Sequence, residues 1–267
     1  SFVLMCPLVM AGDDPYRSAF KHPSLLNPMT SVQPLTNWDV LHYTLDVHLK
    51  PESQTVSATS TISAQASTDA PTIMRLHATG PNITEINVNG LEADWTEARP
   101  FVVLEVPVSV STDDVVEVRV VYTVPPPEGE TFLGVNWGDP IHTFHEPRGA
   151  RKWLVLNDDP ADKATLTWNI RAPSDFSVIA NGLPSDPTPH DDGTRTHHFE
   201  FTEPIPTYLM VLHAGTYDHH LHEDGPVDIH TWAQPEIFAQ AVSDFSNTGD
   251  MMVHFSDLWG AYPWTHY

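Results

Sequence analysis

The chain has 267 residues, of which 40% are apolar, enough for one large β domain and the beginning of another. Acidic side chains number 35 and basic side chains only 12, so the formal net charge is −23. This charge argues against nucleic acid as a partner and gives no indication of membrane contact, because phosphate backbones and anionic lipids repel an acidic surface.

Residues 1–12 are apolar throughout and end at an acidic pair, 13–14. The run is too short to span a bilayer, and its residues 9–11, Val-Met-Ala, are typical of a signal-peptidase site. We interpret 1–12 as the remnant of a signal peptide, which predicts a secreted or periplasmic protein of bacterial type. A buried amino-terminal strand or a wrongly defined gene start would also explain the run. Cys6 is the only cysteine, so an internal disulfide is excluded.

The next segment predicts a large β domain. Residues 13–37 lack periodicity and predict an extended leader, so the domain begins near Trp38. Over 41–49, apolar and polar residues alternate as in a strand with one solvent-exposed face, and Asn89-Gly90 predicts a type I′ hairpin turn. Further strands are predicted at 54–66, 72–78, 84–89, 101–109, 114–123, 165–172, 177–181, 196–202 and 207–217. Such short strands predict a mainly β fold, an antiparallel sandwich or a saddle-shaped sheet.

The pattern changes after residue 226. A short strand at 227–232 is followed by Pro235, a candidate first helical residue, and then by Ile237, Ala241 and Phe245 at four-residue steps. This spacing predicts an amphipathic helix. The residues beyond it would form an apolar surface in need of a partner: Met251, Met252, Phe255, Leu258 and Trp259.

The segment 143–164 reads Thr-Phe-His-Glu-Pro-Arg-Gly-Ala-Arg-Lys-Trp-Leu-Val-Leu-Asn-Asp-Asp-Pro-Ala-Asp-Lys-Ala. Its spaced charges and helix breakers are hard to explain by packing alone. Arg151, Asp158 and Asp159 lie among apolar residues, which predicts a buried or half-buried ion pair that fixes the loop. A simple turn at 158–160 is the alternative.

This segment resembles the pattern T-Q-F-E-P-x-x-A-R-x-x-F-P-C-x-D-E-P-x-x-K-A of the aminopeptidase N family of zinc metallopeptidases, the gluzincins. The residues that match without a gap are Glu146-Pro147, Ala150-Arg151, Asp158, Pro160 and Lys163-Ala164. Later motifs follow in the family order at Ala180–Gly182, Pro204–Leu209 and Gly260–Trp264. Departures include Val155-Leu156 in place of Pro-Cys and Asp159 in place of Glu.

The resemblance implies two parts: an amino-terminal β domain at 38–224, and at 225–267 the first strand and helix of a truncated, thermolysin-like α/β catalytic domain. It also implies the activity of a zinc-dependent aminopeptidase, a hydrolase that removes amino-terminal residues from peptides with a free amino terminus. The family uses one zinc ion.

Glu146 is the predicted substrate-binding residue. In the family, an acidic or amide side chain at this position reaches from the β domain across the interface into the zinc site. A carboxylate can hold a protonated α-amine by charge-assisted hydrogen bonding and so place the first peptide bond. On spacing alone, a pairing of Glu146 with Arg148 or Arg151 is the competing interpretation.

The family's zinc ligands are missing from the sequence. Zinc is held there by a helical His-Glu-x-x-His and a later Glu, and no His-Glu-x-x-His occurs here. His145 and Glu146 precede Pro147, which breaks a helix interior, and residues 222–223 lack a second His at the required step. We interpret the chain as an amino-terminal fragment without catalytic or metal-binding residues, inactive alone, with zinc bound by a following part.

The chain contains 16 histidines, with a cluster at 219, 220 and 222 and others at 197–198 and 213. In a strand, residues 220 and 222 share a face and 219 does not, so the run offers no complete metal shell. Surface histidines in a loop are therefore the preferred interpretation.

Two other functions are compatible with the resemblance. Some relatives have a zinc site that also opens an epoxide. Alternatively, the protein is a non-catalytic, β-rich binding or scaffold protein derived from the same family, since function belongs to sites rather than folds. Glu146 argues against a scaffold, which has no evident need for this carboxylate, and the apolar helix face argues against a free-standing module.

Overall fold

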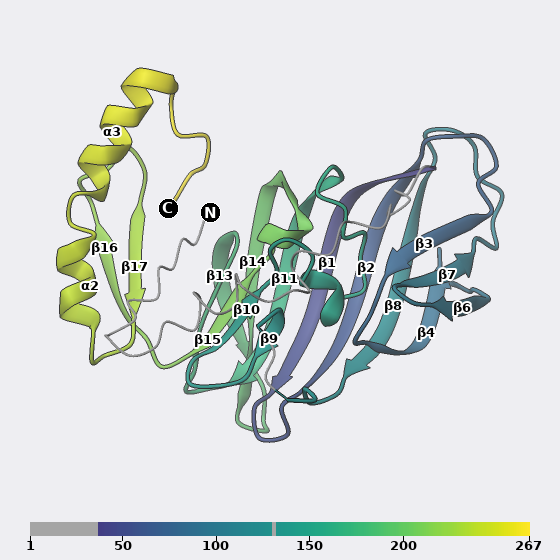
Figure 1. Ribbon diagram of the computed structural model, residues 1–267, viewed down its shortest axis with the longest axis horizontal. Helices are drawn as coiled ribbons and strands as arrows, with labels where there is room; N and C mark the ends of the chain where they lie inside the picture. Colours follow the sequence, from purple (N-terminus) through teal and green to yellow (C-terminus); the bar gives the residue numbers. More distant parts are fainter. Residues whose placement is uncertain (1–36, 130–131) are drawn as a thin grey trace.

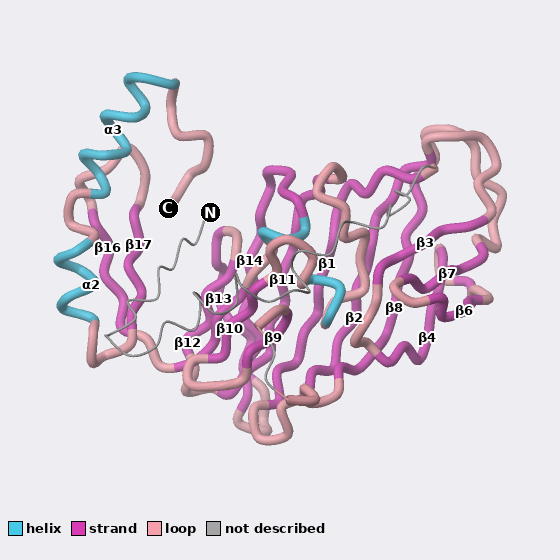
Figure 2. Tube along the Cα trace, viewed as in Figure 1, coloured by secondary structure: helices cyan, strands magenta, loops and turns pink. Residues whose placement is uncertain are grey.

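The computed structural model describes residues 37–129 and 132–267 (Figure 1). The predicted signal remnant at 1–12, Cys6 and the leader up to residue 36 lie outside the described residues. The described chain is mainly β, as predicted, and its α-helices, α2 (Phe238–Asp244) and α3 (Thr248–Trp259), follow the last strand (Figure 2). Neither of these helices combines the length and apolar character that a membrane span requires.

The largest sheet of the described chain has eight strands. Their spatial order is β13 (Leu183–Pro189), β14 (Thr194–Pro206), β11 (Lys163–Pro173), β1 (Trp38–Lys50), β2 (Thr55–Ala66), β8 (Val115–Val124), β4 (Asn82–Val88) and β5 (Leu91–Glu92). All neighbours pair antiparallel except β1 and β11, which run parallel from His42 opposite Thr165 to His48 opposite Arg171. The sheet is thus predominantly antiparallel, as predicted, with one parallel pair that the sequence pattern did not reveal. This pair requires a long crossover, which the chain between these two strands provides.

Three smaller sheets accompany the large one. They consist of β3 (Ile73–His77), β7 (Phe101–Glu105) and β6 (Trp95–Ala98); of β12 (Ser177–Ala180), β15 (Leu212–Gly215), β10 (Ile141–Phe144) and β9 (Gly134–Asn136); and of β16 (Asp218–His222) with β17 (Ile229–Ala233). In Figure 1 the large sheet arches across the molecule, with the β3-β7-β6 sheet at one end. The β16-β17 hairpin lies at the other end, with α2 and α3 on its outer side.

In strand β1 the alternating sequence pattern corresponds to alternating burial of the side chains. Tyr43, Leu45, Val47 and Leu49 are each at most 2% exposed, whereas the residues between them face outward. Leu41, predicted to belong to the buried set, is 38% exposed. The register against β2 shifts between Val40 and His42, and such a bulge leaves the extra residue unpaired and turns its side chain away.

Other predicted elements are close to the observed ones, with two differences at strand ends. Asn89 and Gly90 both have positive φ and join β4 to β5, so the predicted type I′ turn is confirmed. The predicted strand 101–109 ends at Glu105. The predicted strand 207–217 is instead a 3-10 turn, η3 (Thr207–Leu209), followed by the short strand β15.

The carboxy-terminal segment contains the predicted strand and helix. Strand β16 precedes Asp224 and pairs with β17, so the hairpin crosses the predicted boundary between the two parts. The helix begins at Phe238 rather than Pro235, because residues 235–237 form a turn. On α3 the predicted apolar surface is present except at Met252, which is buried. The exposed members are Met251, Phe255, Leu258 and Trp259.

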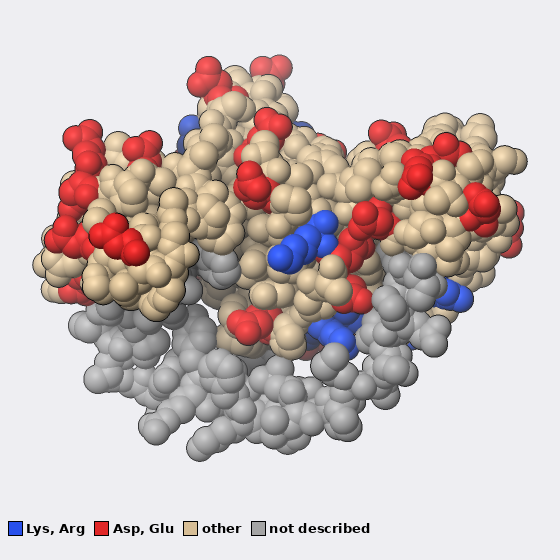
Figure 3. All heavy atoms as spheres, turned by 90° about the horizontal axis from the view of Figure 1, so that it is seen from above, with Lys and Arg blue, Asp and Glu red and all other residues tan. Residues whose placement is uncertain are grey.

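The acidic composition is visible on the surface. Acidic side chains are spread over the face shown in Figure 3, and basic side chains are few among them. The described part of this face therefore presents mainly negative charge, in keeping with the net charge of −23.

Candidate substrate-binding site

Glu146 lies in a tight turn between β10 and a 3-10 helix, η2 (Ala150–Lys152). The amide of Gly149 donates a hydrogen bond to the carbonyl oxygen of His145 at 2.5 Å, which closes the turn around Glu146. A Cβ atom on Gly149 would lie 2.6 Å from the carbonyl oxygen of Phe144, so only glycine fits this close backbone approach. The Glu146 side chain itself is exposed.

The interior side of the turn is held by an indole and an imidazole. His145 is 1% exposed, and its Nε2 accepts a hydrogen bond from Nε1 of Trp153 at 2.7 Å. Trp153 stacks on Trp168 of β11, with ring centroids 6.1 Å apart and planes at 11°. Burial lowers the pKa of His145 to about 3, so its ring is neutral near pH 7 and Nε2 is free to accept.

The predicted ion pair of the 143–164 segment is confirmed and buried. Arg151 Nε lies 2.6 Å from Asp158 Oδ2, and Nη2 donates to the Asp158 carbonyl oxygen at 2.8 Å. Thr207 Oγ1 donates to the other carboxylate oxygen at 3.0 Å, and the Asp158 amide donates to Nδ1 of His77 at 3.0 Å. The pair thus ties the segment to η3 and β3. Burial, reinforced by the Arg151 charge, lowers the pKa of His77 to about 3.

Glu146 has neither an ion pair nor a side-chain hydrogen bond within the described residues. Arg151, one of the two candidate partners, is taken by Asp158. The competing interpretation, in which Glu146 pairs with Arg148 or Arg151, therefore finds no support in this geometry.

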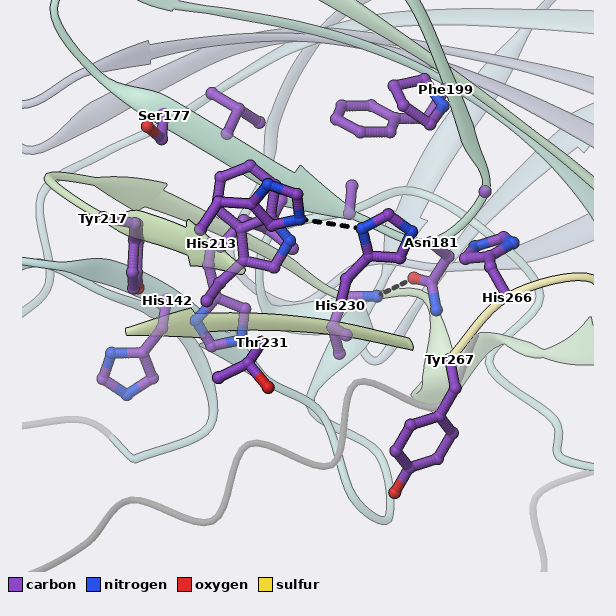
Figure 4. A pocket seen from close by; sticks show the side chains of 18 of the residues that line it. His142, Ser177, Asn181, Phe199, His213, Tyr217, His230, Thr231, His266 and Tyr267 are labelled. Carbon is purple, nitrogen blue, oxygen red and sulfur yellow. Dashed lines mark hydrogen bonds between the residues drawn. The ribbon is translucent and has the colours of Figure 1, made fainter. Parts of the chain in front are cut away.

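Glu146 contributes to the lining of a cavity of about 970 Å³. Figure 4 shows this cavity from close by, with His142, Asn181 and His230 among the labelled lining residues. Strands β10, β12, β13, β14 and β15 form one side of it. Strand β17, helix α2 and the last residues of the chain form the other. Ile237, Ala241 and Phe245 of the predicted amphipathic helix all line it, so the apolar face of α2 is directed at this cavity.

Histidines from both sides line the cavity. His142 and His213 stack with ring centroids 6.0 Å apart, and burial, together with the His142 charge, lowers the pKa of His213 to about 4. On the facing hairpin, Nε2 of His219 and Nδ1 of His230 are 2.9 Å apart, a hydrogen bond drawn in Figure 4. Burial likewise lowers the pKa of His266 to about 4. Near pH 7 these depressed pKa values keep His213 and His266 neutral.

The Ala180–Gly182 motif belongs to the cavity wall. Asn181 Oδ1 accepts a hydrogen bond from the Val211 amide at 2.7 Å, which connects this loop to the start of β15. Gly182 has a φ of +111°, and a Cβ there would lie 2.6 Å from backbone atoms of Glu200. The glycine is therefore required by both the backbone conformation and the close contact with β14.

The described residues do not fit a zinc ion. No group of three or more His, Cys, Asp or Glu among them is placed to hold a metal. These histidines lie in strand β16 rather than in the expected loop, and His220 and His222 share a face of it, but His222 is hydrogen bonded to Thr231 and His219 is stacked on Trp232. We therefore assign no chemical step to a metal held by these side chains.

The Peptidase M1 N-terminal domain matches residues 40–209, and the chain belongs to this family. It is 22% identical to leukotriene A-4 hydrolase from Xenopus laevis over 86% of this chain and 40% of that protein. It is 30% identical to human aminopeptidase N over 36% of this chain and 10% of that protein. The chain thus spans less than half the length of these relatives.

The fold is also that of solved members of the family. The M1 zinc metallopeptidase from Deinococcus radiodurans superposes with a TM-score of 0.77 at 25% identity, covering 86% of this chain and 55% of that one. The mainly β fold and the aminopeptidase N type of family were both predicted from sequence motifs, and both are confirmed.

The sequence motifs did not reveal most of the cavity lining. Asn181 was noted only as part of a motif, and the stacked His142 and His213 come from strands far apart in the sequence. The hydrogen bond between His145 and Trp153 was also missed. Its one available signal was a polar residue, His145, at a position where the quoted family pattern has Phe.

Proposed function

We propose that this chain is the amino-terminal part of a zinc-dependent aminopeptidase, in which Glu146 binds the free amino terminus of the peptide substrate. Family membership supports the peptidase class, and several relatives are named aminopeptidases. Solved M1 zinc metallopeptidase structures include a Deinococcus radiodurans enzyme bound to a Tyr-Ser-Ala substrate and a two-domain enzyme bound to L-tryptophan. Substrates of this kind have a protonated α-amine that an acidic side chain can bind.

The observation that carries the proposal is the state of Glu146. Its carboxylate is exposed at a cavity, stands on a turn with a constrained backbone, and has no protein partner among the described residues. An unpaired carboxylate can accept charge-assisted hydrogen bonds from an ammonium group without first breaking an existing pair. This makes Glu146 the side chain best suited to an amine.

The proposed contribution of the described residues is orientation. Glu146 would fix where the peptide begins, and a fixed amino terminus sets the position of the first peptide bond. Residues that cleave that bond are not assigned within the described chain. The chain alone is therefore expected to hydrolyse no aminoacyl anilide even with added zinc. Hydrolysis by the chain alone that persists in a Glu146→Ala preparation would contradict both this expected inactivity and the proposed role of Glu146.

The test uses the whole protein and an aminoacyl-anilide substrate. Glu146→Ala should raise KM, and lower kcat/KM by a factor equivalent to about 2–4 kcal/mol, because a charged partner of the amine is lost. Glu146→Gln, which keeps an acceptor without the charge, should have a KM between those of the unaltered protein and Glu146→Ala. Arg148→Ala is the matched control in the same turn and should leave KM close to that of the unaltered protein. Unchanged kinetics in Glu146→Ala would make this residue structural.

A further inference from the structure

We propose that His145 and Trp153 are positioning residues for Glu146, because their buried hydrogen bond fixes the turn from which the carboxylate projects. The inference rests on the proposed role of Glu146 and adds the device that orients it. Neither ring needs to touch the substrate for this role.

His145 is held at two points. Its side chain accepts the Trp153 indole hydrogen at 2.7 Å, and its main-chain carbonyl accepts the Gly149 amide at 2.5 Å. Glu146 is the next residue along the chain, so its backbone starts from a residue with little freedom. The buried environment strengthens such a bond and makes its loss costly.

Trp153 is itself anchored in the core. It is 1% exposed, it stacks on Trp168 of β11, and its amide donates to the Ala150 carbonyl at 3.1 Å. A continuous set of contacts therefore leads from the large sheet through Trp153 and His145 to Glu146. Rigid support of this kind lowers the entropy lost when a binding side chain is ordered by its ligand.

The two residues form a matched donor and acceptor. The quoted family pattern has an apolar Phe at the position of His145, and a Phe would leave the Trp153 indole hydrogen without its acceptor. A buried donor without an acceptor is destabilising. Burial lowers the pKa of His145 to about 3, so the ring stays neutral throughout the neutral range, and the Trp153 N–H selects the tautomer in which Nε2 accepts.

The same stack offers a matched pair of variants for the test. Trp153→Phe and Trp168→Phe each remove one indole from the stack, but only the first removes the hydrogen bond to His145. Trp168 Nε1 has no hydrogen-bond partner within the described residues and is equally buried. Any difference between the two variants therefore reports the hydrogen bond rather than the lost ring volume.

In the whole protein, Trp153→Phe should raise KM for an aminoacyl anilide by about three- to tenfold, the range expected for one hydrogen bond, while Trp168→Phe should change it much less. In the Glu146→Ala background the Trp153→Phe change should have no further effect on KM, because it acts through Glu146. Amide hydrogen exchange gives a second readout. Exchange at Gly149 should be faster in Trp153→Phe than in Trp168→Phe.

The outcomes separate the two proposals. Equal KM and equal Gly149 exchange in both Trp variants, with Glu146→Ala still impaired, would overturn the positioning role alone. An unimpaired Glu146→Ala would overturn the proposed function together with the positioning role. If Trp153→Phe fails to fold, His145→Gln and His145→Leu replace it. Gln keeps an acceptor and should retain the native KM, whereas Leu should not, and equal KM values in this pair would contradict the inference.

Discussion

The large sheet and the carboxy-terminal segment, residues 218–267, differ in which side chains they bury and which they expose. Around the sheet even charge is buried and paired: Arg151 is 7% exposed and Asp158 is 1% exposed. In the carboxy-terminal segment large apolar side chains face solvent, with Leu258 at 58% and Trp259 at 77% exposed. The sheet therefore has a complete core of its own, whereas the α3 surface has the apolar character of an interface.

The cavity lies between the carboxy-terminal segment and a wall that β13 and β14 of the large sheet form together with the neighbouring four-stranded sheet. Glu146 is supplied by the well-packed side, where Gly149, Trp153 and Arg151 fix the turn and the loop that follows it. The facing wall, with β17 and α2, belongs to the weakly packed side. One wall of the cavity is therefore backed by a well-packed core, whereas α2 in the other wall has no buried residues, and variants in each region test this difference.

The largest effect is expected at the buried ion pair. Arg151→Ala leaves the Asp158 carboxylate buried without its cation and should lower the free energy of unfolding by about 3–5 kcal/mol, measured by urea denaturation. Arg119→Ala is the matched control, because Arg119 forms an exposed pair with Glu85 at 2.8 Å and should cost no more than about 1 kcal/mol. Equal costs would mean that the Arg151 pair does not anchor the well-packed region.

Backbone substitution at the cavity wall comes next. Gly182→Ala places a Cβ 2.6 Å from backbone atoms of Glu200 at a φ of +111°, so it should cost about 2–3 kcal/mol of unfolding free energy. Gly90→Ala, at a φ of +78° with nothing within 4 Å, should cost only about 1 kcal/mol, the strain of a positive φ alone. Thermal or urea unfolding of the two variants measures the difference. A Gly182→Ala variant as stable as Gly90→Ala would contradict this, because it would mean that the backbone near Glu200 shifts to accommodate the added Cβ.

Acid should weaken the fold through the buried histidines. The pKa of His213 is lowered to about 4 in the folded protein, below the ordinary value of 6.5, so its stabilising contribution is present above pH 6.5 and is lost as the pH falls towards about 4. Asp162 acts in the opposite sense, because burial raises its pKa to about 6 and its contribution grows as the pH falls through that value.

The His213 contribution is isolated by comparing variants at each pH. The urea midpoint of His213→Gln should fall less than that of the unaltered protein between pH 6.5 and pH 4.5, because the variant has no imidazole to protonate on unfolding. His254→Gln, at an exposed position on α3, is the control and should follow the unaltered protein. Parallel pH profiles for all three proteins would exclude the assigned effect of His213.

The smallest effect is expected on the weakly packed side. Trp259→Ser should change the free energy of unfolding by less than about 0.5 kcal/mol, because its side chain is already exposed. Met252→Ala, on the buried side of the same helix, should cost several times as much. A strongly destabilised Trp259→Ser would show that α3 is integrated into the fold, and the contrast between the two regions would fail.

Local sequence patterns correctly predicted the structural features that depend on residues close together in the chain. The alternation of β1, the turn at Asn89-Gly90 and the ion pair of Arg151 with Asp158 all follow from residues near one another in the sequence. The features that the sequence did not predict depend on pairing between residues far apart in the chain. The parallel contact of β1 with β11 joins strands more than a hundred residues apart, and the bulge that exposes Leu41 is set by the register against β2.

The candidate site shows the same distinction between local features, which the sequence indicated, and features formed by distant residues, which it did not. The family pattern indicated Glu146 because the motif around it is short and contiguous. The cavity could not be predicted, because His213, His230 and Asn181 reach it from separate sheets and loops. The hydrogen bond of His145 with Trp153 spans only eight residues, yet it depends on the turn geometry that Gly149 permits, which periodicity does not reveal.

The most direct test of the account is a structure of the whole protein with a bound peptide that has a free amino terminus. The account predicts that the α-amine lies within about 3 Å of the Glu146 carboxylate, the distance of a charge-assisted hydrogen bond. An α-amine held by other side chains, with Glu146 still facing solvent, would contradict it.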